Sequence, residues 1–353
     1  MAAIATRVDV GTGGCVAAPE SKRSSADSPP QSRSAGFSAE AKGGLLTQIM
    51  LALRAMATRF ELVLHEENAT RLRAAGEAAL REIERLEARL SLYRPTSEIA
   101  RVNAQAARQP ARVSPSVFGL LERARALQKE SGGAFDITVA PLVRCWGFMH
   151  GKGRLPAPAE IEEARGCSGM AHVILDKQNN SVRFDKEGVM LDLGAIGKGY
   201  AIDCAAEILR EAGVTSALLH GGTSTVYGIG SPPDAEGWKI AIDAGPDGAG
   251  ASRSGPADSV LLRDNALSVS AVWGKSFEVD GKKFGHVIDP RTGWPVNNAV
   301  QAAVVLPSAT ETDALSTALL VMGPDGLEDI RRLRPDMQAR VAAPVEQGFR
   351  AER

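Results

Sequence analysis

The chain has 353 residues, of which 44% are hydrophobic and 24% are charged, as in an average soluble globular protein. Its formal net charge is −1, with 41 basic residues against 42 acidic ones, so it lacks the basic excess of a nucleic-acid-binding protein. The four cysteines form no CxxC pair, which argues against a zinc site or a disulfide framework: Cys15, Cys145, Cys167 and Cys204.

The first 44 residues differ in composition from the rest of the chain. They are rich in Ala, Ser, Gly and Pro, and Phe37 is their single aromatic residue. Because such a segment buries too little apolar surface to offset its ordering entropy, we predict a disordered tail over 1–44 and one folded domain over 45–345. No apolar run reaches the ~18 residues of a transmembrane segment. No clear signal peptide or lipobox is present, which favours the cytoplasm over a periplasmic or membrane-anchored location and leaves the compartment open.

Regular patterning begins near Thr47. Alternation of apolar and polar residues over 58–65 predicts a strand. Apolar residues at helical spacing predict a helix over 69–91 and a second over 115–131. Residues 172–193 predict a hairpin followed by a third strand over its last five residues, 189–193.

The second half of the chain mixes strands, glycine-rich connections and helices. We expect a helix through Arg210 after a glycine-rich turn, and a flexible surface loop over 243–257. Strands are predicted over 216–219, 260–263, 266–270 and 276–288, and a last helix over 311–322. Because the helices are interspersed rather than strictly alternating with strands, the pattern favours an α+β fold with mixed, largely antiparallel sheets and packed helices.

Two glycine-rich segments could bind an anion. Asp192–Tyr200 joins a strand to a helix, where main-chain N–H groups, the helix N-terminus and Lys198 could meet a phosphate. It matches neither the dinucleotide fingerprint nor the P-loop, so a tight packing turn is the alternative. His220–Thr225 brings glycines and hydroxyls after a strand, and a plain hairpin turn explains it equally well.

Two further segments carry side chains suited to catalysis or metal binding. His286 lies just before a tight Asp289-Pro290 turn, where it could relay a proton or simply pack at a strand edge. Asp313, Ser316 and Thr317 share one helical face, and their oxygens are a hard-ligand set that suits Mg²⁺. A helix-capping role is the alternative for the aspartate.

The order of these segments, with three others, resembles the ApbE family, the FAD:protein FMN transferases, over roughly residues 56–340. The additional segments are Met56–Thr58, Leu92–Asn103 and Gly133–Leu142. The resemblance implies an ApbE-like, T-fold-like domain. It also implies an Mg²⁺-dependent transferase that cleaves FAD, releases AMP and attaches FMN to a Ser or Thr hydroxyl of an acceptor flavoprotein.

The resemblance also implies roles for individual residues. His286 would be catalytic and lie beside the transferring phosphate. Mg²⁺ would be held by the Ala195 carbonyl and by the side chains of Asp313, Thr317 and Ser316. The residues that would hold FAD are Met56, Tyr93, Ala134, Phe135, Asp136, Asp192, Lys198 and Val287.

The sequence departs from the family pattern at three places. The family's glycine is replaced by Ala57, its Asn-rich strand before the paired glycines reads Leu219-His220 here, and its Ser-Gly step reads Ser270-Ala271. These changes put the acceptor in doubt more than the binding of FAD. Two alternatives keep the fold: an Mg²⁺-dependent FAD pyrophosphatase that yields AMP and FMN, and a flavin-binding protein without turnover.

Overall fold

The computed structural model describes residues 6–8, 46–149, 151, 153–243 and 259–344. Its centre is a seven-stranded sheet of order β15-β14-β11-β8-β7-β3-β2, in which every neighbouring pair is antiparallel. The strands are β2 (Thr47–Ala55), β3 (Thr58–Glu66), β7 (Ala217–Gly221), β8 (Thr225–Ile229), β11 (Asn265–Ala271), β14 (Gln301–Leu306) and β15 (Gln338–Ala342). The predicted α+β class with largely antiparallel sheets is confirmed.

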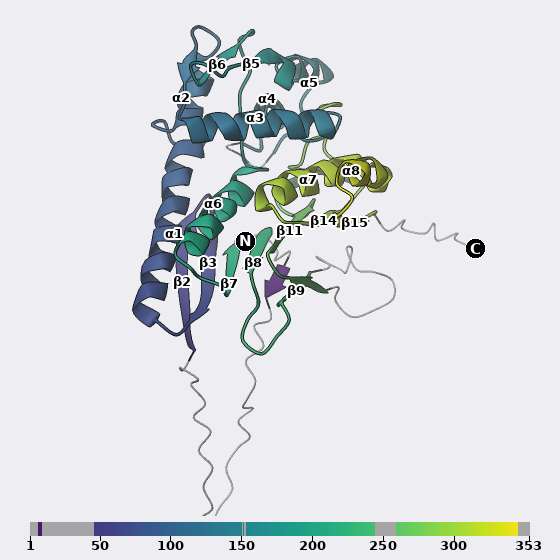
Figure 1. Cartoon of the computed structure of the whole chain (residues 1–353). Coiled ribbons are helices and arrows are strands. Elements are labelled where there is room, and N and C mark those ends of the chain that lie inside the picture. Colours follow the sequence, from purple (N-terminus) through teal and green to yellow (C-terminus); the bar gives the residue numbers. More distant parts are fainter. Residues whose placement is uncertain (1–5, 9–45, 150, 152, 244–258, 345–353) are drawn as a thin grey trace, which may run out of the picture.

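Helices α1, α6 and α7 cover one face of this sheet and enclose the main hydrophobic core. Figure 1 shows α3 lying across them, above α6 and α7, with β5, β6 and α5 beyond it. The helices are α1 (Ala69–Leu90), α2 (Glu98–Gln105), α3 (Pro115–Glu130), α4 (Ala140–Cys145), α5 (Pro158–Arg165), α6 (Gly197–Glu211), α7 (Ala309–Met322) and α8 (Leu327–Leu333). The predicted helices over 69–91 and 115–131 correspond to α1 and α3, whose N-termini are capped by Asn68 and Ser114.

A small sheet covers the opposite face of the large one. It consists of β1 (Thr6–Val8), β9 (Trp238–Ile242) and β10 (Ser259–Leu262), and a second apolar cluster lies between the two sheets. Strand β1 falls inside the segment for which we predicted disorder. It pairs with β9 through the main chain, an interaction that needs no apolar side chains and that composition therefore does not reveal. The rest of 1–44 lies outside the described residues.

The expected third strand over 189–193 is absent. The hairpin before it is present as β5 (Val173–Asp176) and β6 (Ser181–Phe184), and β4 (Ala111–Arg112) pairs with β6 instead. The Asn103 amide takes the place of a partner strand, because it accepts a hydrogen bond from the Leu191 N–H (2.8 Å) and donates one to the Leu191 carbonyl (2.9 Å). A side chain thus satisfies main-chain groups that otherwise need a ladder.

The single strand expected over 276–288 is a hairpin, β12 (Ser276–Val279) and β13 (Lys282–Gly285). Asp280 and Gly281 both have positive φ, 51° and 71°, which matches the two-residue turn that Asp-Gly favours. An aromatic cluster packs this hairpin onto α4 and α5: Trp146, Phe148, Phe277 and Phe284.

The predicted surface loop over 243–257 lies outside the described residues except for Asp243. Within the part of the chain that the structure describes, no helix combines the length and the apolar character of a membrane span.

Candidate active site

The glycine-rich segment after Leu191 forms a turn that leads into α6. Its Asp192 carboxylate accepts a hydrogen bond from the Gly194 N–H at 2.8 Å. Burial raises the pKa of Asp192, while the neighbouring positive charge of Lys198 acts in the opposite direction. Lys198 lies in the first turn of α6 and donates a hydrogen bond to the Gly194 carbonyl at 3.0 Å. A cation and a helix N-terminus therefore occur together, as an anion site requires.

Helix α7 brings Asp313 to this turn. Its carboxylate is 3% exposed and accepts a hydrogen bond from the Gly199 N–H at 3.0 Å. The Lys198 ammonium lies 3.6 Å from the other carboxylate oxygen, and the Thr225 hydroxyl lies 3.5 Å from it. The two glycine-rich segments that the sequence singled out thus meet at one buried carboxylate.

The hydroxyls of Ser316 and Thr317 lie one turn further along α7. Both donate to the Asp313 main-chain carbonyl, at 3.1 and 3.3 Å, and both contact the Ser270 hydroxyl on β11, at 2.9 and 3.2 Å. Ser316 is fully buried, whereas Thr317 is half-buried. Their shared helical face is as predicted, but their hydroxyls are directed to Ser270, whereas the Asp313 carboxylate is directed to α6.

Tyr93 lies near Asp192, and Met56 lies in the turn between β2 and β3. The Tyr93 side chain is 59% exposed, and burial of its hydroxyl together with the nearby charge of Asp192 raises its pKa. Met56 and Ala57 form the turn between β2 and β3, with φ of 50° and 59°. The Met56 N–H donates to Glu87 of α1 at 2.9 Å, which fixes that turn against the helix.

The segment that begins at Gly133 lies beside the same turn. Ala134 and Phe135 are each 1% exposed, and the Ile137 carbonyl accepts a hydrogen bond from the Asp192 N–H at 2.7 Å. The Asp136 carboxylate accepts from the N–H and the hydroxyl of Thr138, at 2.8 and 2.5 Å. Burial nevertheless raises the pKa of Asp136.

His286 directly follows β13. Among the described residues, its buried Nδ1 has no hydrogen-bond partner. A Cβ built on Gly274 would lie 2.9 Å from the imidazole, and the Phe148 ring meets it edge-on at 6.5 Å. Burial lowers the pKa of His286, so the imidazole is neutral near pH 7 and able to accept a proton.

The turn after His286 is rigidly held. The Asp289 carboxylate forms a bidentate pair with Arg291, with both distances 2.9 Å, and the Gly293 carbonyl accepts from the Trp146 indole at 2.8 Å. The Val287 carbonyl already accepts a hydrogen bond from the Val296 N–H at 2.9 Å. Gly133 lies against Arg291, so this turn also borders the 133–138 segment.

The structure therefore brings part of the predicted set together at the glycine-rich turn. Lys198 contacts Asp313 directly, the charge of Lys198 acts on Asp192 and that of Asp192 on Tyr93, and Ala195 is half-buried in the same turn. His220 faces away: Gly221 packs on Ile202 of α6, and adjacent strand residues point to opposite faces. Sequence reasoning assigned no role to Ser270 or Asn103, although the family-like segments contain or border both.

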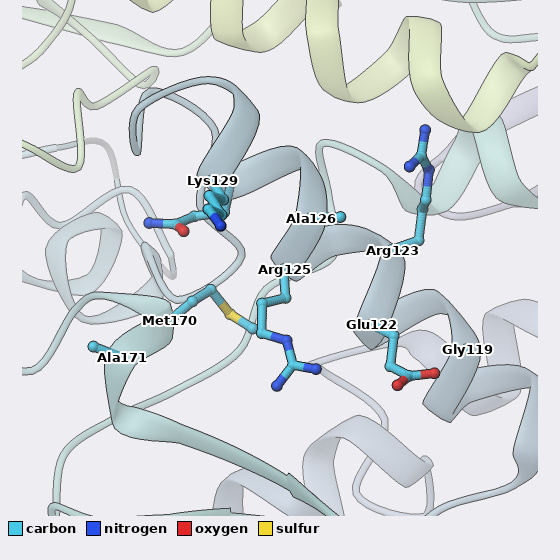
Figure 2. A pocket seen from close by; sticks show the side chains of 9 residues that line it. Gly119, Glu122, Arg123, Arg125, Ala126, Lys129, Met170 and Ala171 are labelled. Carbon is cyan, nitrogen blue, oxygen red and sulfur yellow. The ribbon is translucent and has the colours of Figure 1, made fainter. Parts of the chain in front are cut away.

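Two surface hollows border α3, and no predicted site residue lines either of them. Figure 2 shows the larger, of about 840 Å³, between α3 and Met170-Ala171, with the side chains of Glu122 and Arg125 on its wall. The smaller, of about 440 Å³, lies between Ser116, Tyr200 and the start of α7. In the described residues no three His, Cys, Asp or Glu side chains converge to hold a metal ion. A metal at this site would therefore depend on one carboxylate with hydroxyl and main-chain oxygens.

Comparisons with known proteins show which family the chain resembles in sequence and fold. The sequence model of the ApbE family matches residues 56–341. The FAD:protein FMN transferase of Salmonella typhimurium is 31% identical over 249 residues, which cover 69% of each chain. That of Treponema pallidum is 32% identical over 267 residues, 72% of this chain and 73% of its own. The apo crystal structure of the Pseudomonas stutzeri flavinyl transferase ApbE superposes with a TM-score of 0.75 at 27% identity, covering 86% of this chain and 93% of that one.

Proposed function

The chain belongs to the ApbE family, and on that premise we propose that it is an FAD:protein FMN transferase. It cleaves the diphosphate of FAD, releases AMP and attaches FMN to a Ser or Thr hydroxyl of an acceptor protein. The observation that carries this proposal is the convergence of Lys198, the N-terminus of α6 and the buried Asp313 at one glycine-rich turn. A diphosphate needs positive charge and main-chain N–H groups, and the turn supplies both.

FAD is held by groups on several elements. Lys198 and the N-terminus of α6 face the diphosphate. The exposed ring of Tyr93 offers an aromatic face, and Met56 approaches from the β2–β3 turn. Asp136, Ala134 and Phe135 would border FAD next to the turn, which their segment bonds through the Ile137 carbonyl, and Val287 would add a main-chain contact. Asp192 fixes the turn itself through Gly194.

The residues present fit a magnesium ion, which the family implies. Asp313 is a buried carboxylate that already attracts the Lys198 ammonium, and the surrounding donors are hard oxygens. The ion would be held by Asp313, Thr317, Ser316 and the Ala195 carbonyl. Both hydroxyls contact Ser270, but Ser316 is fully buried and Thr317 only half-buried, so Thr317 is the better placed of the two. When bound, Mg²⁺ neutralises negative charge on the diphosphate.

The transfer exchanges one phosphorus–oxygen bond for another. The acceptor oxygen forms a bond to the FMN phosphorus, the bond from that phosphorus to the bridging oxygen breaks, and AMP leaves with that oxygen. The acceptor hydroxyl loses its proton during the attack. His286 accepts it, because its imidazole is neutral and its Nδ1 has no partner among the described residues.

A single experiment separates this function from its two alternatives. Purified protein is incubated with FAD and Mg²⁺, with and without a flavoprotein that carries a Ser/Thr flavinylation site, and AMP and acceptor mass are measured. AMP release only with the acceptor, together with an FMN adduct on it, supports the transferase. AMP without acceptor identifies a pyrophosphatase, and FAD binding without AMP identifies a non-catalytic flavin protein.

A further inference from the structure

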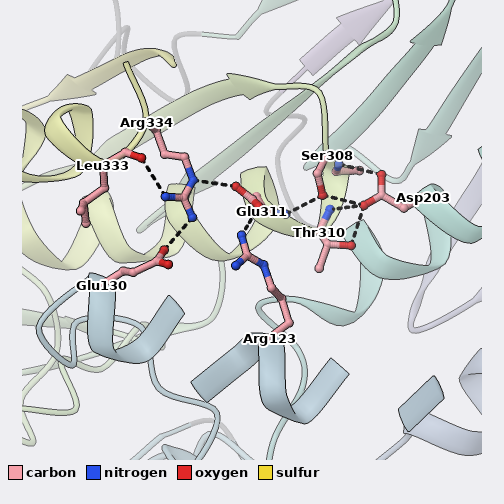
Figure 3. Close-up of polar contacts among 9 residues, drawn as sticks. Arg123, Glu130, Asp203, Ser308, Thr310, Glu311, Leu333 and Arg334 are labelled. Atoms are coloured by element: carbon pink, nitrogen blue, oxygen red, sulfur yellow. Dashed lines mark hydrogen bonds and ion pairs between the residues drawn. The ribbon is translucent and has the colours of Figure 1, made fainter. Parts of the chain in front are cut away.

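Asp203 of α6 is bonded by four groups at the start of α7. Its carboxylate accepts hydrogen bonds from the Ser308 hydroxyl (2.8 Å), the Ala309 N–H (2.8 Å) and the N–H and hydroxyl of Thr310 (2.9 and 2.6 Å). Figure 3 shows these contacts converging on the one carboxylate. The first N–H groups of a helix have no partner within the helix, so a carboxylate from a neighbouring helix here acts as a cap.

A second contact joins the same two helices one turn away. On α6, Gly199 precedes Asp203 by four residues, and its N–H donates to Asp313. A Cβ at Gly199 would lie 2.1 Å from the Ala309 carbonyl oxygen, so the two backbones touch there. Asp203 therefore binds the first turn of α7, and Gly199 binds the following turn, where Asp313 lies. A displacement of the first contact moves Asp313 relative to Gly199 and Lys198.

We propose that Asp203 is a positioning residue, which holds α7 against α6 so that the Asp313 carboxylate stays beside the glycine-rich turn. The inference rests on the proposed function in one respect, namely that Asp313 binds the metal. Asp203 itself touches neither metal nor FAD in this account. It acts through the N-terminus of α7.

Glu311 provides a matched control on the same helix. It lies one residue after Thr310, but its carboxylate pairs with Arg123 of α3 and with Arg334 (2.8 Å), while Arg334 also binds Glu130 (2.7 Å). Figure 3 shows this ion-pair network next to the Asp203 contacts. Replacing Glu311 weakens the attachment of α7 to α3 and leaves its attachment to α6 in place. Loss of stability alone can thus be told apart from loss of position.

The experiment compares Asp203→Asn, Asp203→Ala and Glu311→Gln with the wild type. Binding of Mn²⁺ to the FAD-free protein is followed by electron paramagnetic resonance, and Mg²⁺ activation of AMP release is titrated separately. Two metal constants are compared, the dissociation constant for Mn²⁺ and the Mg²⁺ concentration for half-maximal AMP release. We expect Asp203→Asn to raise both by about 10-fold, with kcat at saturating Mg²⁺ close to that of the wild type, and Asp203→Ala to raise them further. Glu311→Gln should lower the melting temperature and leave both metal constants unchanged.

Two outcomes overturn the inference. One is an Asp203→Asn protein with wild-type metal constants, and the other is a Glu311→Gln protein with the same rise as Asp203→Asn. If the Asp203 variants do not fold, Ser308→Ala and Thr310→Val replace them, because each removes a hydroxyl that donates to the Asp203 carboxylate. Unchanged metal constants in both of these variants would also overturn the inference. Failure of the proposed function is distinguishable, because the wild type would then release AMP without an acceptor or no AMP at all, while the Mn²⁺ titration still tests Asp203.

Discussion

The Lys198 ammonium lies 3.6 Å from the Asp313 carboxylate and donates a hydrogen bond of 3.0 Å to the Gly194 carbonyl. One cation therefore links α7 to the turn that precedes α6. The pair is shielded from water, since the Asp313 side chain is only 5% exposed and that of Lys198 is 21% exposed. Removing either partner leaves the other partly buried and unpaired, and we expect loss of Asp313 to impair metal binding and loss of Lys198 to impair FAD binding.

Asp313→Ala should abolish Mg²⁺-dependent AMP release while the protein stays folded. The substitution removes the carboxylate charge near the turn and leaves the Gly199 N–H without an acceptor, which costs about 1–3 kcal/mol of stability. Activity and melting temperature are measured together. Asp329→Ala, which removes an exposed carboxylate paired with Arg332, is the control and should change neither greatly. Full turnover of Asp313→Ala at ordinary Mg²⁺ would remove this residue from the metal site.

Lys198→Met should weaken FAD binding and raise the KM for FAD by about 10-fold, because an apolar stem of similar length keeps the packing and loses the charge. FAD affinity is measured by flavin fluorescence, and KM from AMP release. Lys239→Met, at an exposed position on β9, controls for the loss of one positive charge from the molecule. Equal FAD affinity in the two variants would contradict a role for Lys198 at the diphosphate.

Ala57→Gly should stabilise the protein by about 1 kcal/mol, because Ala57 is held at φ 59°, where a Cβ crowds the backbone. The gain is measured as the free energy of unfolding in urea. Ala52→Gly, at an exposed position within β2, should destabilise it instead, since glycine only adds unfolded-state entropy there. A loss of stability at both positions would show that the turn between β2 and β3 carries no such strain.

The sequence predicted the elements whose signals are local. Capping residues and apolar spacing identify α1 and α3, and the alternation over 58–65 identifies β3. Family-like segments identified Lys198 and Asp313 as neighbours in function, although they lie far apart in the chain. None of this required knowledge of tertiary contacts.

Apart from the local β12–β13 hairpin, the contacts that sequence reasoning missed join distant segments. Asn103 binds Leu191 across 88 positions, and so replaces the strand predicted there. Asp203 caps a helix that begins more than 100 positions later, and its residue type alone is equally compatible with an exposed helical carboxylate. Ser270 reaches Ser316 across 46 positions. Such pairings depend on how the sheet places its strands, which periodicity does not determine.

Acid should destabilise the fold in a defined range. Burial lowers the pKa of His65, His220 and His286 below the ordinary value of 6.5. Below pH 6.5 the unfolded chain takes up these protons before the folded one, so the free energy of unfolding falls as pH decreases from that value. His220→Leu should reduce the slope between about pH 6.5 and 5. Urea unfolding at several pH values checks this, and an unchanged slope would contradict a buried neutral His220.

His286→Asn is the variant for which a packing role and a catalytic role differ most. If His286 only packs against Gly274 and Phe148, the substitution costs stability and leaves the transfer rate nearly intact. If the imidazole accepts the acceptor's proton, FAD still binds normally and the transfer slows by roughly 10²–10⁴-fold. His220→Asn is the matched control, since this histidine is also buried with an unpartnered Nδ1 among the described residues but lies on the sheet face away from α6.

The pH dependence of the transfer rate separates these two roles further. A neutral imidazole is the active form of a base, so the wild-type rate should fall in acid with a midpoint below 6.5, because burial lowers the pKa of His286 from that value. The same acidic limb should vanish in His286→Asn and persist in His220→Asn. A pyrophosphatase would show the same dependence, so the profile tests the proton transfer and not the identity of the acceptor. An unchanged rate in His286→Asn between about pH 6 and 9 would exclude His286 as the base. Asp289, which lies three residues later in the sequence, would then be the next group to replace.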